Sequence, residues 1–108
     1  MRLELKELFK KYNDEMFGGL LPEVPIELGD CDGCCGYLDP KDFPFIKIDP
    51  EYNESYKMLK GTLIHEMIHL WQLEYELNSV IDNDNEWHNG LFEQFADFAE
   101  IKYKLEVK

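Results

Sequence analysis

A largely apolar run from Met58 to Trp71 most constrains how this 108-residue chain can fold. Within the run, large apolar side chains recur every three or four residues, which is the spacing of an α-helix. They are Leu59, Leu63, Ile64, Met67, Ile68 and Trp71. A helix that is apolar on most of its surface is a buried helix, so we expect the rest of the chain to pack around it. Asn53 and Ser55 are both candidate caps for its start, and its end is expected near Leu77.

The same run contains His65-Glu66-Met67-Ile68-His69, the His-Glu-x-x-His pattern of zinc hydrolases. A spacing of four residues places the two histidines one helical turn apart on one face, where they can hold one metal ion. Glu66 can then take a proton from a water whose pKa a metal lowers to about 7. The alternative is two core histidines satisfied by hydrogen bonds. Burying two histidines and a glutamate without a partner is costly, so a metal site is favoured.

A catalytic zinc site has three protein ligands, and the sequence offers two candidates for the third. The extended protease pattern with a glycine and a later third histidine fails, because Gln72 and Tyr75 stand at those positions. His88 is the only other histidine. Glu93, with Asp97 four residues later, fits the class of sites with a glutamate ligand. Spacing alone does not decide between His88 and Glu93.

The segments on either side of this run have weaker patterns that still indicate helices and strands. Residues 3–17 have apolar positions at helical spacing, and Gly18-Gly19 ends this first helix. Three short strands separated by turn residues are predicted at Ile26–Leu28, Cys35–Leu38 and Phe45–Ile48. A further helix is predicted from Trp87 onward, with an apolar side formed by Leu91, Phe92, Phe95, Phe98, Ala99 and Tyr103. The expected fold is α+β, with a small three-stranded antiparallel sheet packed against three helices.

Composition limits the classes of partner. The net charge of −12 repels phosphate backbones, so strong nucleic-acid binding is not expected. The charged N-terminal residues do not resemble a signal peptide, and no apolar run is long enough to span a membrane. A cytoplasmic protein that is a single domain over residues 1–108, and a monomer, is therefore expected.

Two polar clusters carry weaker signals. Cys31, Cys34 and Cys35 include one half of a zinc knuckle, but the second half is missing, so we interpret them as reduced thiols at a strand end. The segment Asp82-x-Asp84-x-Glu86 lacks the glycine and the distal glutamate of a calcium loop. A solvated loop before the last helix is the simpler interpretation.

Several segments together carry a family resemblance. They are Leu8-Phe9-x-x-Tyr12-Asn13-x-x-x-Phe17-x-x-x-Leu21-Pro22, Gly36-Tyr37, Ile46-x-Ile48, Thr62-Leu63-Ile64-His65-Glu66-Met67-Ile68-His69-x-Trp71-Gln72, and His88-Asn89-Gly90-Leu91-Phe92. Nearly the whole chain thus resembles the SprT-like zinc metalloprotease family, whose members include Spartan. The matching segments correspond to the protease domain of the family alone. The C-terminal zinc ribbon of the bacterial members is not found in residues 1–108. Asn89 also departs from the glycine that is usual in the family.

The resemblance implies a zincin-like fold and a zinc-dependent endopeptidase. It implies that His65, His69 and His88 hold Zn²⁺, that Glu93 is not a ligand, and that Glu66 activates the attacking water. The implied substrates are proteins or peptides, either unfolded or associated with DNA. We expect the strand Phe45–Ile48 to be a sheet edge that pairs with an extended substrate. The alternative functions are a metal-stabilised binding module without catalysis and an accessory protein of nucleic-acid metabolism.

Overall fold

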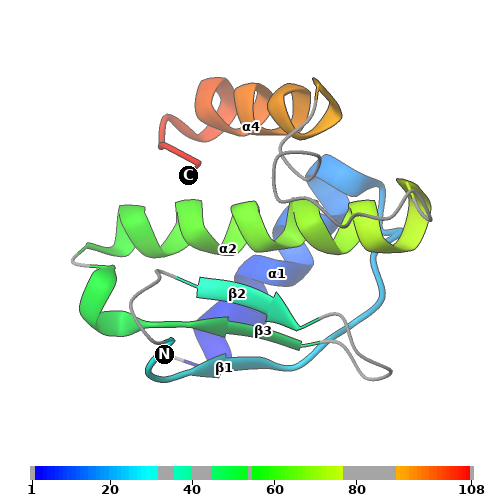
Figure 1. Ribbon diagram of the computed structural model, residues 1–108. Coiled ribbons are helices and arrows are strands. Elements are labelled where there is room, and N and C mark those ends of the chain that lie inside the picture. Colours follow the sequence, from blue (N-terminus) through cyan, green and yellow to red (C-terminus); the bar gives the residue numbers. More distant parts are fainter. Residues whose placement is uncertain (1, 32–35, 40–44, 54, 77–89, 108) are drawn as a thin grey trace.

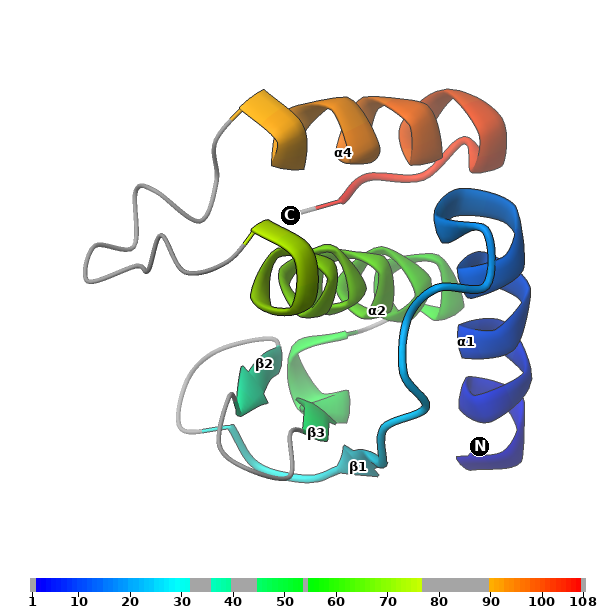
Figure 2. The same ribbon diagram turned by 90° about the vertical axis from the view of Figure 1, so that its right-hand side faces the viewer.

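Helix α2, Tyr56–Trp71, forms the middle layer of the protein, between a three-stranded sheet and helix α4, Gly90–Tyr103 (Figure 1). Helix α1, Arg2–Phe17, packs along the side of this stack (Figure 2). The computed structural model describes residues 2–31, 36–39, 45–53, 55–76 and 90–107. The predicted α+β class is confirmed.

The central helix begins at the second of the two predicted caps. Ser55 is the N-cap, and its hydroxyl accepts a hydrogen bond from the Met58 backbone N–H at 3.1 Å. Asn53 instead ends a short 3₁₀ turn, Pro50–Tyr52. After Trp71 the helix continues as one π turn, Gln72–Glu76, and the predicted end near Leu77 lies outside the described residues. The buried residues of α2 are Leu59, Gly61, Thr62, Leu63, Ile64, Glu66, Met67, Ile68 and Leu70.

The prediction of an antiparallel sheet was wrong. The strands β1, Ile26–Leu28, β2, Gly36–Asp39, and β3, Phe45–Ile48, lie in the order β1-β3-β2. Strand β1 pairs with β3 in parallel, whereas β2 pairs with β3 antiparallel. The parallel pair is fixed at both ends by main-chain hydrogen bonds, from Ile46 to Pro25 at 3.0 Å and from Gly29 to Ile48 at 3.0 Å. Pairing of consecutive strands would give an antiparallel sheet, but the chain instead places β3 between β1 and β2.

This order also overturns the prediction that Phe45–Ile48 is a sheet edge. Strand β3 is central, its residues Ile46 and Ile48 are buried, and α2 packs against it. The two edges are β1 and β2. Of these, β2 lies against α2, with the methyl group of Thr62 in close approach to the backbone of Gly36. A side chain at position 36 would contact that methyl carbon at 2.9 Å, which explains the glycine.

A buried polar network ties the end of β3 to α2. Asp49 is 2% exposed, and its carboxylate accepts hydrogen bonds from the backbone N–H groups of Cys31, at 3.0 Å, and Glu51, at 2.9 Å. The Asn53 amide donates to the Asp49 carbonyl, and the Thr62 hydroxyl donates to the Asn53 side-chain oxygen, both at 2.6 Å. Since Thr62 lies one turn before Glu66, this network fixes the sheet against the chemically important part of the helix.

The first helix ends as predicted at two glycines with positive φ, Gly18 at 61° and Gly19 at 76°. The connector that follows returns along α1. The Asn13 side chain donates to the Leu21 carbonyl at 3.1 Å and accepts from the Leu21 N–H at 3.0 Å. Residues Leu5, Phe9, Tyr12 and Phe17 of α1 join the core beneath α2.

After α4 the chain reverses at Lys104, whose φ is 54°, and returns across α2. Leu105 and Val107 of this tail are buried in the core. The tail crosses at Gly61, where an added Cβ would overlap the Glu106 carbonyl oxygen. Gly61 is therefore the position that lets the tail backbone approach the helix.

The apolar side predicted for the last helix needs one correction. Phe92, Ala96 and Ala99 are buried, and Phe95 and Tyr103 pack against the core, but Phe98 is 44% exposed. The predicted start at Trp87 and the loop with Asp82, Asp84 and Glu86 lie outside the described residues. Among the described helices, none has both the length and the apolar character needed to cross a membrane.

Candidate metal centre

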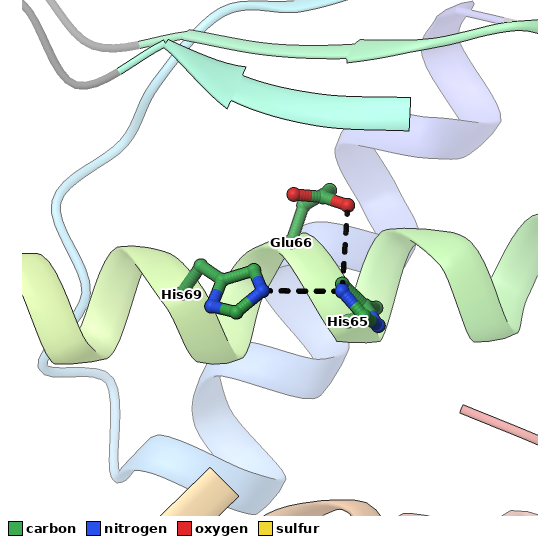
Figure 3. Close-up of side chains that lie close together, drawn as sticks. All are labelled: His65, Glu66 and His69. Carbon is green, nitrogen blue, oxygen red and sulfur yellow. Dashed lines mark hydrogen bonds and ion pairs between the residues drawn. The ribbon is translucent and has the colours of Figure 1, made fainter. Parts of the chain in front are cut away.

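Helix α2 brings the side chains of His65, Glu66 and His69 close together, with the Glu66 carboxylate extending toward the sheet (Figure 3). The Nε2 atoms of the two histidines lie 3.1 Å apart. One carboxylate oxygen of Glu66 lies 3.9 Å from Nε2 of His65. The three side chains offer ligand atoms that all lie within 4.8 Å of one another. Both histidines are partly exposed, whereas Glu66 is only 5% exposed.

The spacing of the two imidazole nitrogens fits a shared metal ion. Zn–N bonds of about 2.0–2.1 Å at a tetrahedral angle place two nitrogens about 3.3 Å apart. The observed 3.1 Å is close to that value. It is also the length of a hydrogen bond between the rings, so distance alone does not distinguish the two arrangements. Two imidazoles beside a carboxylate are a donor set suited to a divalent transition metal, and the group can therefore hold a metal ion.

Gln72 determines which nitrogen of His69 can bind a metal. Its side-chain oxygen lies 2.8 Å from Nδ1 of His69, and an amide oxygen only accepts. Nδ1 must therefore carry the proton, which leaves a lone pair on Nε2 in the neutral ring. Gln72 is 1% exposed, so its amide is held in place. The sequence motifs include Gln72 but do not assign it this role, although its position three residues after His69 places the two side chains within reach on a helix.

Phe92 of α4 closes the site on the side away from the sheet. Its ring centroid lies 4.9 Å from that of His65 and 5.1 Å from that of His69. The two imidazoles also contact each other edge to face, with centroids 4.7 Å apart. An apolar ring against both histidines restricts their rotamers and excludes water from one side. The pattern predicted Phe92 as a core residue and did not reveal this role.

Burial raises the pKa of Glu66 from 4.5 to about 8. The cause is removal of the carboxylate from water, which disfavours its charged form. In the metal-free protein Glu66 is therefore largely protonated at neutral pH. A divalent cation beside the histidines would favour the carboxylate and lower this pKa.

Of the two candidates for a third ligand, Glu93 and His88, the structure describes only Glu93. Glu93 is exposed in the first turn of α4 and is not part of the group that gathers around His65. His88 lies outside the described residues, as do Cys34 and Cys35. Cys31 is buried, and its thiol lies 3.6 Å from the Gly29 carbonyl oxygen.

The fold and this site define an α+β domain whose central helix presents a His-Glu-His group able to hold a metal ion. A family model, the SprT-like family, matches residues 5–108, which is essentially the whole chain. The chain belongs to the SprT-like family, and it is a metalloprotease-like domain. A comparison with curated protein sequences finds no match.

Proposed function

We propose that this protein is a zinc-dependent endopeptidase that hydrolyses peptide bonds with Glu66 as general base. The observation that supports this proposal best is the placement of Glu66 beside the paired Nε2 atoms of His65 and His69, in a chain of the SprT-like family. A site that only stabilises the fold has no need of a buried carboxyl group next to its ligands. The net charge of −12 further favours a protein substrate over a nucleic acid.

His65, His69 and His88 are the proposed zinc ligands. The first two have the spacing described above, and His88 precedes α4, the helix whose Phe92 contacts both imidazoles. Glu93 is the rejected alternative because it is exposed and stands apart from the group. Bound zinc would supply a Lewis acid that polarises the scissile carbonyl group and acidifies a water molecule.

Glu66 is the residue proposed to move protons. Its carboxylate takes a proton from the attacking water and later gives one to the departing amine nitrogen. Its burial keeps bulk water from competing for these transfers, and its carboxylate lies beside Nε2 of His65, one of the proposed ligand atoms (Figure 3). Gln72 keeps His69 in the tautomer that this chemistry needs.

The free edge of β2 is the proposed binding site for the substrate backbone. Strand β2 pairs with β3 on one side, and no described strand pairs with its other edge. It packs on α2, and the Glu66 carboxylate points toward it (Figure 3). An extended peptide that added to this edge would run past the metal group, held by main-chain hydrogen bonds.

The test of catalysis compares wild type with Glu66→Gln on an unfolded protein substrate, after both are loaded with zinc. The matched control is Glu74→Gln, which neutralises an exposed glutamate in the π turn that extends α2. We expect Glu66→Gln to retain zinc and lose about 10²–10⁴-fold in rate, and Glu74→Gln to behave as wild type. Equal cleavage by wild type and Glu66→Gln would refute the general base. Zinc-loaded wild type that cleaves no substrate in a broad peptide library would favour the binding-module alternative.

The ligand assignment is tested separately by metal content. His65→Ala, His69→Ala and His88→Ala should each lower the bound zinc per chain, while Glu93→Ala should keep one equivalent. Circular dichroism confirms that each variant is folded. Full zinc in His88→Ala together with loss in Glu93→Ala would reverse the assignment.

A further inference from the structure

A concave surface lies where α1, the end of α2 and α4 meet. Its cavity has a volume of about 330 Å³ and is lined by Glu15, Met16, Trp71, Gln94, Phe95 and Phe98. Trp71 follows His69 by two residues, so on a helical wheel it points about 160° away from that histidine. This cavity therefore opens on a different face of α2 from the metal group.

Apolar side chains extend from this cavity onto the surface of α4. Phe98 is 44% exposed and Ile101, one turn later, is 79% exposed. Within the cavity, Trp71 packs on Phe95 with ring centroids 5.0 Å apart, which gives it a rigid aromatic wall. Large apolar residues this exposed and this close together are typical of an interaction site.

Acidic residues run beside this apolar stripe. Glu93, Asp97 and Glu100 are all exposed and follow one another at helical spacing on the neighbouring side of α4. Lys102, the lysine that lies over the Phe98 ring, is already paired with Glu15. Lys102 lies 3.5 Å from a Glu15 carboxylate oxygen and 5.5 Å from the centre of the Phe98 ring, and Tyr103 donates to Glu15 at 2.6 Å. The surface next to the apolar stripe is thus negative.

We propose that this surface, formed by the cavity, Phe98 and Ile101, binds a basic segment of another protein through one large apolar anchor side chain. A cavity of this volume is at the low end for ligand sites and suits a side chain better than a cofactor. Lysine or arginine residues beside the anchor would face Asp97 and Glu100. The same charges repel nucleic-acid phosphates and anionic lipids. They also oppose pairing with a second copy, which has the same charge of −12.

This binding goes beyond peptide hydrolysis and needs neither metal nor cleavage, so it can be tested alone. The probe is a short synthetic peptide with a central phenylalanine and leucine flanked by lysines, compared with the same peptide flanked by glutamates. Each is titrated into ¹⁵N-labelled Glu66→Gln protein, which protects the peptide, and amide and indole shifts are followed by NMR. Two double variants form the matched pair. Phe98→Ser/Ile101→Ser removes the proposed surface, and Met58→Ser/Leu20→Ser removes two side chains that are 45% and 61% exposed elsewhere.

We expect the lysine peptide to shift the Trp71 indole and residues 94–101, and the glutamate peptide to bind much more weakly. The Phe98→Ser/Ile101→Ser variant should lose about tenfold or more in affinity, whereas the control variant should keep it. Asp97→Asn/Glu100→Gln and added salt should both weaken binding. Equal binding of the two peptides, equal losses in the two serine variants, or no shifts with either peptide would overturn the proposal. Self-association that disappears in Phe98→Ser/Ile101→Ser would also overturn it, because a second copy would then be the occupant.

Discussion

The side-chain oxygen of Gln72 lies 2.8 Å from Nδ1 of His69, and so holds that ring with its Nε2 lone pair toward His65. A buried amide thus acts on the metal group through a neighbouring histidine. His65 and His69 would touch a metal directly, whereas Gln72 would only position one of them.

Gln72→Leu should weaken zinc binding while keeping the helix intact. Loss of such a supporting hydrogen bond typically costs about 10–100-fold in metal affinity. The matched control is Gln94→Leu, which changes an exposed glutamine on α4 in the same way. Competition with a chromogenic chelator measures both affinities. An unchanged affinity in Gln72→Leu would show that the amide does not select the tautomer.

The metal-free protein should become less stable as pH rises from about 4.5 to 8. Over this range the unfolded chain has released the Glu66 proton, whereas the folded chain retains it because its pKa is about 8. The unfolded state therefore binds fewer protons, and the free energy of unfolding falls with rising pH. The total change should be a few kcal/mol.

Urea unfolding with a chelator present, at several pH values, measures this dependence. Glu66→Gln should remove the Glu66 contribution and leave the rest of the pH dependence, which both proteins share. If the two proteins show parallel stability curves, Glu66 does not hold its proton in the folded state.

Gly61→Ala should destabilise the protein by displacing the C-terminal tail. The added methyl group would meet the Glu106 carbonyl, which is backbone and cannot rotate away. Such crowding typically costs about 1–3 kcal/mol. The control is Gly29→Ala, where the nearest atoms belong to the flexible Lys47 side chain. Thermal unfolding of both variants, with hydrogen exchange at residues 104–107, would detect the displacement. Equal melting temperatures would show that the tail adapts at little cost.

Thr62→Val should weaken the link between the sheet and α2. The substitution removes the hydroxyl that donates to Asn53 at 2.6 Å in a buried setting. Loss of one partner from a buried hydrogen bond typically costs about 1–3 kcal/mol. Thr62→Ser keeps the hydroxyl and should retain more of the stability. Denaturant unfolding ranks the variants, and a Val variant as stable as wild type would contradict the importance of this bond.

The sequence predicted local features better than long-range ones. The central helix, its His-Glu-x-x-His face and the glycine end of α1 follow from spacing and capping within a few turns of chain. The pairing of Ile26 with Ile46 joins residues far apart in sequence, and period-two patterns carry no information about which neighbour a strand chooses. The contacts of Phe92 with the two histidines depend on packing between α4 and α2, which the sequence pattern does not specify. The contact of Gln72 with His69 is local, three residues along the same helix, but the spacing alone does not say that the two side chains meet. Phe98 had the right spacing for the core and yet faces outward, because the core side of α4 is filled by Phe92, Ala96 and Ala99.

Because Phe92 contacts both imidazoles, proton NMR can detect the arrangement of the site through the chemical shifts of the histidine ring protons. An aromatic ring about 5 Å from a neighbouring ring alters the local magnetic field, so the ring protons of His65 and His69 should resonate away from their usual positions. These signals report where α4 sits, without metal, substrate or an attached label. A movement of α4 that left the histidines in place would change their spectrum while leaving the secondary structure content unaltered.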